Sequence, residues 1–288
     1  MKENIAFVNG NFVPEQRAVV SIFDRGFLYG DGLFATIRVC QGQPFRWRRH
    51  LLRLHRGADL LRITIPETDE KLRAIAVELA RNNELENGAL RVAISRGVGT
   101  GGYSPAGATH PTLTMTVRPL SVRAPGQPLS WRCATSKLTL RSDDPLAWFK
   151  TSNRLLQVLA RGEAERAGFD EALLLNEEGH VVEATSGNLF WIQEGQICTA
   201  PLGTGILPGI ARSTLFEIGE TLGQRVQERT ISRDDLIQSE GAFISMSTLG
   251  VVEIVQVDDL DLKRSPLVSI CHKAYEELVK FETADQGR

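Results

Sequence analysis

A single lysine, Lys150, stands between two aromatic residues and a predicted helix, in the stretch Trp148-Phe149-Lys150-Thr151-Ser152-Asn153. Apolar surroundings disfavour the charged form of an amine and lower its pKa. A neutral amine forms a Schiff base with an aldehyde. The same pattern also fits a lysine that lies along an apolar surface with its charge in water. Lys150 is therefore a candidate nucleophile whose assignment depends on the rest of the chain.

A carboxylate stands at the end of a predicted strand in Glu183-Ala184-Thr185-Ser186-Gly187-Asn188. A carboxylate that leaves a buried strand is unusual unless it is paired. Beside a pyridine ring, Glu183 would keep the ring nitrogen protonated and so make the ring an electron sink. The alternative is a glutamate in a solvated turn, with Asn188 satisfying backbone groups.

Three further features suit a phosphate. The segment Leu207-Pro208-Gly209-Ile210-Ala211 places Pro and Gly at a helix start, where backbone N–H groups and the helix dipole favour an anion. The segment Ser245-Met246-Ser247-Thr248 ends a strand with three hydroxyls, and the guanidinium of Arg53 is able to reach phosphate oxygens. Each also has an ordinary interpretation, as a well-made helix start, a polar strand end and a surface arginine.

Two other patterns indicate less. Residues 97–102 contain a literal GxGxxG after a predicted strand. A dinucleotide-binding motif requires a helix to begin there, which Pro105 disfavours, so we expect a mobile loop over a pocket instead. His50 and His55 are five residues apart and do not form a metal-binding pair on one helix face, and we expect no metal site.

Composition sets the protein class. At 288 residues the chain is long enough for a large core and two domains, and its 42% hydrophobic and 24% charged residues are ordinary for a globular protein. A net charge of −2 gives no reason to expect nucleic acid or an anionic membrane as a partner. The four cysteines form no CxxC pair, which favours buried thiols in a reducing compartment. No signal-peptide block or membrane-spanning run is present, which favours the cytoplasm.

The periodicity of the first part of the chain predicts an α+β arrangement. The expected elements are strands at 5–8 and 12–13 joined by an Asn9-Gly10 turn, a β-rich run at 18–23, a strand at 33–40, helices at 47–61 and 67–83, and strands at 90–95 and 111–117.

The second part of the chain predicts a strand meander flanked by helices. The expected elements are a strand at 129–134, a helix at 152–167, strands at 171–175, 181–184, 188–192 and 196–199, a helix from Pro208-Gly209 to 222, strands near Val226, near Phe243 and at 251–257, and a last helix. That helix is expected to have Ser265 as its N-cap and Pro266 as its first residue.

A segment rich in Pro and Gly separates the two parts. Residues 119–128 show no periodicity and form the best candidate for a linker. We therefore predict a small α+β domain at 1–118 and a larger domain at 129–288.

The candidate residues together resemble a known family. Arg53, Lys150, Glu183 with Asn188, and the Leu207–Ile210 segment occur in the order and approximate spacing of the class IV aminotransferases, the fold-type IV pyridoxal-phosphate enzymes. The resemblance covers nearly the whole chain, from Tyr29-Gly30-Asp31-Gly32 to Val257. It implies a small α/β N-terminal domain, a larger C-terminal domain with a pseudo-barrel, pyridoxal 5'-phosphate as cofactor, and a homodimer whose partner helps to build the substrate pocket.

The resemblance also implies a role for each candidate. Lys150 would be the Schiff-base lysine and proton shuttle, and Glu183, with Asn188 beside it, would pair with the pyridine nitrogen. The phosphate would be held by Arg53, the backbone of Ile210 and Ala211, and the hydroxyls of Ser247 and Thr248. The substrate pocket would be lined by Tyr29, Thr36, Arg38 and Arg91.

Arg38 and Arg91 are the candidates for the substrate carboxylate, because a guanidinium makes a two-pronged match to it. Either residue could equally form a structural ion pair.

The subgroup of the family that the chain resembles is less well defined. Branched-chain enzymes tend to carry Phe-Glu-Gly-Ile-Arg where this chain has Phe34-Ala35-Thr36-Ile37-Arg38, and D-amino-acid enzymes tend to carry an Arg and a His where this chain has Gly101 and Tyr103. Aminodeoxychorismate lyases are similar at Asn153-Arg154-Leu155.

We therefore predict a cytoplasmic class IV aminotransferase that moves an amino group between a small aliphatic, branched-chain or D-amino acid and a 2-keto acid. The second hypothesis is a 4-amino-4-deoxychorismate lyase that releases 4-aminobenzoate and pyruvate. A third, from another class, is a cofactor-free binding protein on the same fold, which the intact set Arg53, Lys150 and Glu183 argues against.

Overall fold

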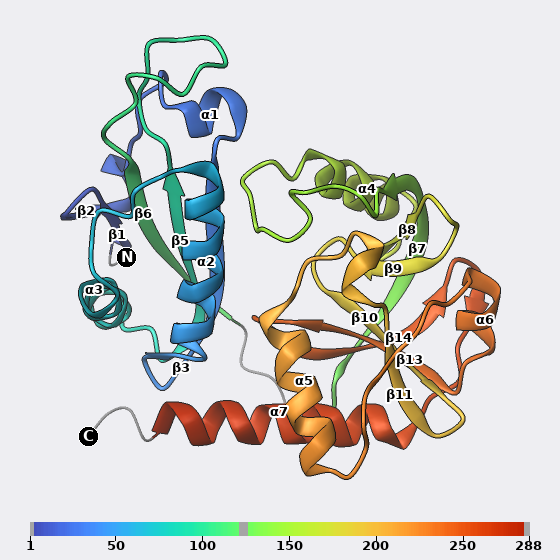
Figure 1. Ribbon diagram of the computed structural model, residues 1–288. Helices are drawn as coiled ribbons and strands as arrows, with labels where there is room; N and C mark the ends of the chain where they lie inside the picture. Colours follow the sequence, from blue (N-terminus) through green and yellow to red (C-terminus); the bar gives the residue numbers. More distant parts are fainter. Residues whose placement is uncertain (1–2, 121–125, 285–288) are drawn as a thin grey trace. The chain divides into compact units, whose positions relative to one another are not determined.

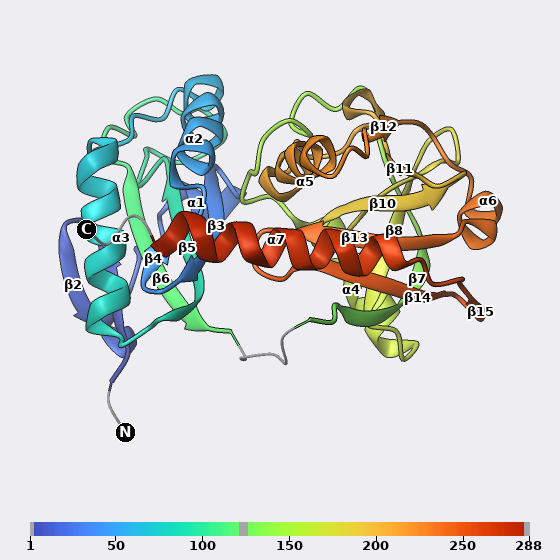
Figure 2. The same cartoon turned by 90° about the horizontal axis from the view of Figure 1, so that it is seen from below.

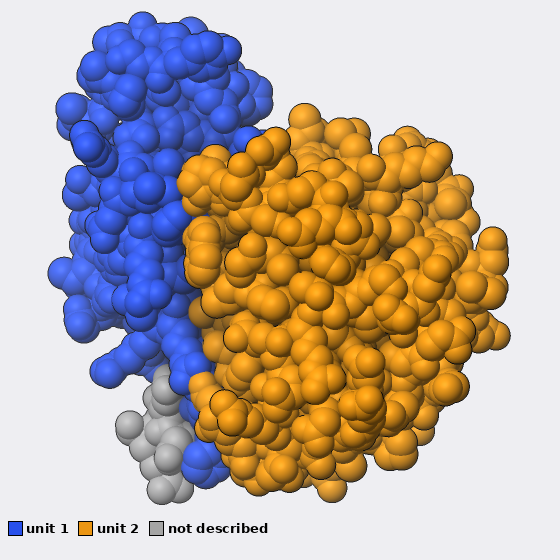
Figure 3. Space-filling model, turned by 45° about the vertical axis from the view of Figure 1, so that its right-hand side comes forward, with its two compact units in different colours: residues 1–122, 149–153, 279–288 blue, residues 123–148, 154–278 orange. Residues whose placement is uncertain are grey.

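The computed structural model describes residues 3–120 and 126–284, which form two compact units (Figure 1). The first unit comprises residues 1–122, 149–153 and 279–288, and the second comprises residues 123–148 and 154–278 (Figure 3). The expected linker at 119–128, and with it the division into domains at 1–118 and 129–288, stays a prediction. Residues 121–125 of that linker lie outside the described residues.

The first unit is built on a six-stranded antiparallel sheet with the order β2-β1-β6-β5-β3-β4. Its strands are β1 (Ile5–Val8), β2 (Asn11–Pro14), β3 (Gly32–Cys40), β4 (Gln43–Pro44), β5 (Asn87–Ser95) and β6 (Thr112–Pro119). The expected strands of this part are confirmed except the run at 18–23, and the expected hairpin turns at Asn9 and Gly10, both of which have positive φ.

Alternation along the strands gives this sheet one buried face. Every second residue of β3 from Leu33 to Val39 is buried, whereas Phe34, Thr36 and Arg38 point to the opposite face. The buried face packs against α2 (Trp47–Leu61) and α3 (Asp69–Asn82), whose apolar residues recur at helical spacing (Figures 1 and 2). This packing leaves the other face of the sheet available for polar side chains.

The β-rich run at 18–23 is not a strand, so that prediction is wrong. The Ser21 hydroxyl accepts from Phe23 N at 3.1 Å, and Asp24 N donates to Ser21 O at 3.0 Å, so the chain turns instead. The Asp24 carboxylate then caps a short helix that the sequence analysis missed, α1 (Arg25–Tyr29), by accepting from Gly26 N at 2.7 Å.

The second unit contains a closed barrel of six strands in the order β10-β13-β14-β7-β8-β9, because β9 also pairs with β10. The strands are β7 (Leu129–Leu140), β8 (Glu171–Asn176), β9 (Val181–Ala184), β10 (Asn188–Gln193), β13 (Gly241–Met246) and β14 (Gly250–Val257). Strands β11 (Gln196–Thr199) and β12 (Gln227–Glu228) extend the sheet beyond β10, and β15 (Leu260–Asp261) pairs with β14. The expected pseudo-barrel is confirmed, and with it the α+β fold of type IV.

Helices surround this barrel (Figure 2). They are α4 (Leu155–Arg166), α5 (Ile210–Thr221), α6 (Arg233–Gln238), which the sequence analysis missed, and α7 (Pro266–Ala284), whose last residues from 279 onward belong to the first unit. The predicted start of the last helix is confirmed, with Pro266 first and the Ser265 hydroxyl accepting from Leu267 N at 3.4 Å. The described residues contain no helix that is both long and apolar enough to span a bilayer.

The helix expected at 152–167 begins later, at Leu155. Residues before it are held by backbone bonds to β3, because Ser152 N donates to Gly32 O at 2.8 Å and Phe34 N donates to Lys150 O at 2.9 Å. The segment 149–153 thereby pairs with the start of β3, and this pairing competes with the helix.

The buried His50 on α2 should make the stability of the first unit depend on pH. It is 1% exposed, and burial lowers its pKa well below the usual value, with the charges of Arg53 and Lys150 lowering it further. Below about pH 6.5, His50 binds a proton in the unfolded chain but stays neutral in the folded chain. As the pH is lowered below about 6.5, the free energy of unfolding should therefore decrease by up to about 1.4 kcal/mol per pH unit.

We expect His50→Asn to remove the contribution of His50 to the slope of the free energy of unfolding against pH between about pH 6.5 and pH 5. Urea unfolding of the cofactor-free protein at several pH values measures it. His110→Gln, at an exposed position, serves as the control and should keep the wild-type slope. An unchanged slope in His50→Asn would show that His50 takes up no proton on unfolding.

Candidate active site

The fold distributes the predicted site residues over both units. The first unit holds Tyr29, Thr36, Arg38, Arg53, Arg91 and Lys150, and the second holds Glu183, Asn188, Ile210, Ala211, Ser247 and Thr248. In the first unit they come from one face of the sheet and from adjacent helices. In the second they come from one end of the barrel and the start of α5. The roles expected for them stay predictions.

Lys150 is fixed by backbone pairing and by its aromatic neighbours. The segment 149–153 pairs with β3 through an isolated bridge between Thr151 and Leu33, and Phe149 packs on the apolar core of the first unit. The Lys150 Nζ atom lies 4.8 Å from the centroid of the Phe34 ring. The lysine is thus held beside an aromatic face by contacts of its backbone and its neighbours.

Phe34 also contacts a second cation, so it links two of the predicted residues. The Arg91 guanidinium lies 3.7 Å from the Phe34 ring centroid, and Arg91 stands opposite Thr36 in the pairing of β3 with β5. Phe34, Thr36 and Arg38 share one face of β3 by alternation, and Arg91 projects from β5 on that same face. Phe34 was not among the residues predicted for the site, although its place in the alternation of β3 was a usable signal.

Arg53 and Lys150 come together around His50. Both charges act on the buried His50 ring and lower its pKa, although the two residues are far apart in sequence. Arg53 lies on α2 about one turn after His50, on the same side of the helix. In the first unit, the charges of the amine and of one of the predicted phosphate ligands therefore both act on the buried His50 ring.

Tyr29 ends α1 and packs against the Gly-rich loop that follows β5. Its ring centroid lies 5.5 Å from that of Tyr103, and the Arg25 guanidinium lies 5.0 Å from the Tyr29 ring. Arg25 also donates to the carbonyls of Gly102 at 2.8 Å and Tyr103 at 3.1 Å. The loop contains no helix, which agrees with the rejection of a dinucleotide motif, and Arg25 anchors it.

Glu183 in the second unit is a buried carboxylate, 7% exposed, so a glutamate in a solvated turn is excluded. Its Oε2 atom accepts from Leu207 N at 3.1 Å and from Asn188 Nδ2 at 3.2 Å. Asn188 stands directly opposite Glu183 in the pairing of β9 with β10 and also donates to Leu207 O at 2.9 Å. These bonds fix the carboxylate in one orientation, as a partner for a cationic ring nitrogen must be.

Arg154, just before α4, is a positive charge in this region that was quoted above within a motif but was given no role. Burial lowers its pKa, and the negative charges of Glu183 and Asp144 oppose that effect. Glu183 and Arg154 therefore compensate one another, which sequence alone did not reveal because they lie far apart in the chain and in different elements.

The start of α5 lies against Asn188. A Cβ atom on Gly209, the N-cap of α5, would lie 2.1 Å from Asn188 Oδ1, so only glycine allows this approach. Gly209 brings no side chain to cap the first turn, whose amide groups at Ile210 and Ala211 suit an anion. The predicted acid and the predicted phosphate site are thus joined through Asn188.

The end of β13 adds hydroxyls to the same end of the barrel. Ser245 pairs with Asn188 in register, is 2% exposed, and its Oγ atom has no hydrogen-bond partner among the described residues. Ser247 and Thr248 lie in the turn that leads from β13 to β14. The second unit therefore combines a fixed carboxylate, a helix start and a set of hydroxyls, which together fit a phosphorylated pyridine ring.

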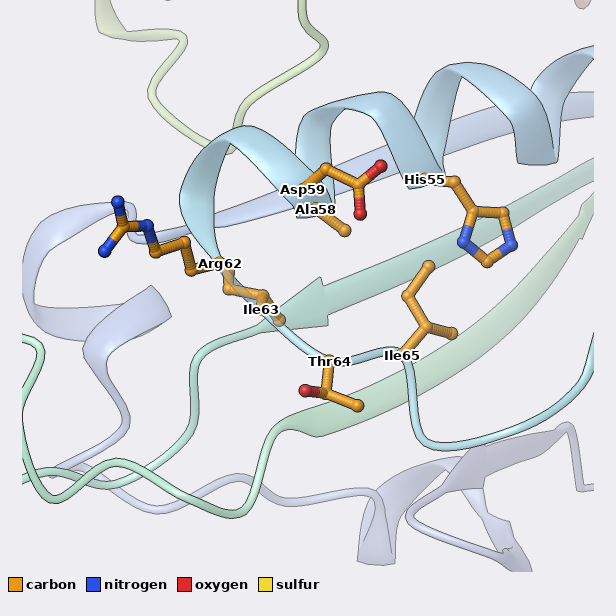
Figure 4. A pocket seen from close by; sticks show the side chains of 7 residues that line it. All are labelled: His55, Ala58, Asp59, Arg62, Ile63, Thr64 and Ile65. Carbon is orange, nitrogen blue, oxygen red and sulfur yellow. The ribbon is translucent and has the colours of Figure 1, made fainter.

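Two hollows lie in the first unit away from most of these residues. One, of about 220 Å³, is bordered by residues of α1, β5 and β6 together with Ser152. The other, of about 460 Å³, lies at the end of α2 and contains none of the predicted site residues (Figure 4). It is lined by His55, Ala58, Asp59, Arg62, Ile63, Thr64 and Ile65.

The fold and the donor set together define a class of enzyme that uses a phosphorylated pyridine cofactor. A family model for amino-transferase class IV matches residues 32–257. The chain therefore belongs to the class IV aminotransferase family, as the resemblance predicted, and it is an enzyme of this class, a transaminase or an aminodeoxychorismate lyase.

Similar proteins include members with either activity in their names. The chain is 33% identical over 277 residues to a putative branched-chain-amino-acid aminotransferase of Methanocaldococcus jannaschii, covering 96% of each protein. It is 30% identical over 253 residues to an aminodeoxychorismate lyase of Vibrio harveyi, covering 86% of this chain and 89% of that protein. The crystal structure of the Thermoproteus uzoniensis branched-chain aminotransferase with norvaline matches with a TM-score of 0.90 at 26% identity, covering 99% of this chain and 97% of that one. Another branched-chain amino acid aminotransferase of this fold was solved with pyridoxamine 5'-phosphate.

Proposed function

We propose that this protein is a pyridoxal 5'-phosphate aminotransferase that moves an amino group between a small aliphatic, branched-chain or D-amino acid and a 2-keto acid by a ping-pong mechanism. The observation that carries the proposal is the buried Glu183 carboxylate, which two N–H donors orient beside the glycine-bordered start of α5. A carboxylate so held suits a protonated pyridine nitrogen, and the helix start suits a phosphate.

The family resemblance assigns each candidate residue a role toward the cofactor. Lys150 would attach it covalently, Glu183 and Asn188 would face the ring nitrogen, and Arg53 would bind the phosphate. The phosphate would also meet the backbone of Ile210 and Ala211 and the hydroxyls of Ser247 and Thr248. When bound, the cofactor supplies an electron sink for the bond that breaks at the substrate Cα. The Lys150 amine would take the proton from that Cα and act as the proton shuttle of the reaction.

The substrate would lie over the polar face of the first unit's sheet. Arg38 and Arg91 carry the charges that match a carboxylate, and Thr36, which stands opposite Arg91, adds a hydroxyl. Tyr29 would border the site, since its ring is packed in place against Tyr103. The position of Arg91 on Phe34, which also contacts Lys150, supports placing a carboxylate near the reactive amine.

The second candidate is 4-amino-4-deoxychorismate lyase, which the similarity to the Vibrio harveyi protein favours. One experiment separates the two: release of pyruvate and 4-aminobenzoate from aminodeoxychorismate is measured beside keto-acid production from a panel of L- and D-amino acids. Turnover of the panel alone supports the aminotransferase. Lyase turnover alone overturns it, and a purified protein that stays colourless with added pyridoxal 5'-phosphate would support a cofactor-free binding protein.

We also propose that the protein works as a homodimer in the cytoplasm. Val19, Ile22, Phe23 and Phe27 form an apolar patch before and within α1, with exposures between 63% and 74%. A patch of this kind marks an interface, and a second copy is the occupant that the family resemblance indicates. All four cysteines are buried thiols, which suits a reducing compartment.

Replacing Phe23 and Phe27 together with aspartate should raise the dimer dissociation constant by about 10²-fold or more, because each buried phenylalanine contributes about 1.5–3 kcal/mol. Sedimentation velocity at several concentrations measures the change. Phe281→Asp on α7, where the side chain is 71% exposed outside the patch, is the matched control. Equal dissociation constants for the two variants would show that the patch is not the interface.

A further inference from the structure

A second buried carboxylate, Glu171, lies at the start of β8 and is 0% exposed. Its Oε1 atom accepts from Ala172 N at 2.8 Å and from the Thr185 hydroxyl. Its Oε2 atom accepts from Arg161 Nη1 at 3.0 Å and from the Ser186 hydroxyl. A buried charge is stable only with this kind of full compensation, so the four donors and the carboxylate depend on one another.

The two hydroxyls belong to the turn that joins Glu183 to Asn188. Thr185 and Ser186 come two and three residues after Glu183. Ala184 N donates to Gly187 O at 2.8 Å and so closes the turn. Thr185 N also donates to Ala172 O at 3.1 Å, which ties the turn to β8. Glu171 therefore holds the turn through the side chains of Thr185 and Ser186, beside a backbone bond from the same strand.

The opposite side of the turn is tightly packed. A Cβ atom on Gly187 would lie 2.3 Å from Ser245 O, so the turn is packed directly on β13. Loss of the bonds to Glu171 would remove the side-chain anchors on the other side. A shift of a few tenths of an ångström there would lengthen the 3.2 Å bond between Asn188 and Glu183.

Arg161 links the same carboxylate to α4. Its Nε atom donates to Glu165 at 2.8 Å, and its guanidinium lies 5.7 Å from the Trp131 ring centroid on β7. The cluster thus connects α4, β7, β8 and the turn. Packing alone would not need a charged residue at 171, whereas simultaneous orientation of two hydroxyls and a guanidinium does.

We propose that Glu171 is a positioning residue for Glu183 and Asn188, acting through Thr185 and Ser186. This inference rests on the proposed function in so far as it names the cofactor's ring nitrogen as the group that Glu183 serves. The positioning itself concerns only residues of this chain, so it is open to measurement without the cofactor.

The test compares Glu171→Gln with Glu253→Gln. Glu253 is a similarly buried barrel glutamate on β14, 4% exposed and bonded to Arg264 Nε at 3.1 Å, but it holds no part of the turn. In the cofactor-free protein, amide hydrogen exchange at Ala184 and Thr185 should be about tenfold faster or more in Glu171→Gln and unchanged in Glu253→Gln. Equal exchange at these amides in both variants overturns the inference.

Cofactor binding gives the second measurement. Titration of the cofactor-free protein with pyridoxal 5'-phosphate should show an affinity about 10-fold to 100-fold weaker for Glu171→Gln, the range typical of residues that orient a ligand's direct contacts. The pKa of the bound cofactor's ring nitrogen, measured by ¹⁵N NMR of labelled cofactor, should also be lower, because a displaced Glu183 stabilises the protonated nitrogen less well. Glu253→Gln should match the wild type in both.

The double variant Thr185→Val with Ser186→Ala keeps the test valid if Glu171→Gln does not fold. It removes the two donors and leaves Glu171 with Arg161 and Ala172 N, and it should reproduce the faster exchange and the weaker affinity. Normal exchange and affinity in this variant would overturn the inference. A wild type that binds no pyridoxal 5'-phosphate would instead overturn the proposed function, while the exchange result would still decide the role of Glu171.

Discussion

Lys150→Ala is expected to abolish covalent attachment of pyridoxal 5'-phosphate and to lower kcat by at least about 10⁴-fold, because it removes both the nucleophile and the group that moves the Cα proton. The fold should survive. The segment 149–153 pairs with β3 through its backbone, and Phe149 supplies its anchor in the core, so neither contact needs the lysine side chain.

Borohydride reduction followed by mass spectrometry of the intact protein measures the attachment. Lys137→Ala, at an exposed position on β7, is the matched control and should retain both the fixed cofactor and the activity. Cofactor still fixed by reduction to Lys150→Ala would show that another amine forms the bond. In that case the contact of Lys150 with Phe34 would be structural only.

Glu183→Gln is expected to lower kcat by about 10²-fold to 10³-fold, the usual loss when one preorganised electrostatic partner of the reacting group is removed. The change keeps an oxygen that accepts from Leu207 N and Asn188 Nδ2 and removes only the charge. The pyridine nitrogen would then lose its counter-charge, and the pKa of that nitrogen should be lower than in the wild type.

Steady-state kinetics and a pH titration of the ring nitrogen by ¹⁵N NMR of labelled cofactor measure the two effects. Glu178→Gln, in the exposed turn between β8 and β9, is the control for the same substitution in the same hairpin and should behave as the wild type. A kcat within about threefold of wild type for Glu183→Gln would be too small a loss for an electrostatic partner of the reaction and would remove Glu183 from its assigned role.

Local patterns in the sequence were sufficient for much of the fold. The Asn9-Gly10 hairpin, the helix at 47–61 and the helix that begins at Pro266 each carry their own turn, periodicity or cap, and each was predicted at or near its observed bounds. The run at 18–23 failed because Ser21 accepts from Phe23 N through its hydroxyl and from Asp24 N through its carbonyl, so the chain turns there. The helix near Ser152 was predicted too early because a distant strand, β3, pairs with its first residues.

Sequence by itself determined the family, since Arg53, Lys150, Glu183 and the segment at 207–210 are recognisable by type, order and spacing. It also indicated a pseudo-barrel, although only through that resemblance.

The tertiary structure alone decided which distant side chains meet. Phe34 contacts both Lys150 and Arg91, Arg154 compensates Glu183, and Glu171 holds the turn at 185–186. The physical reason is that burial, charge compensation and hydrogen bonding at these positions depend on strands and helices that are far apart in the chain and adjacent only after folding.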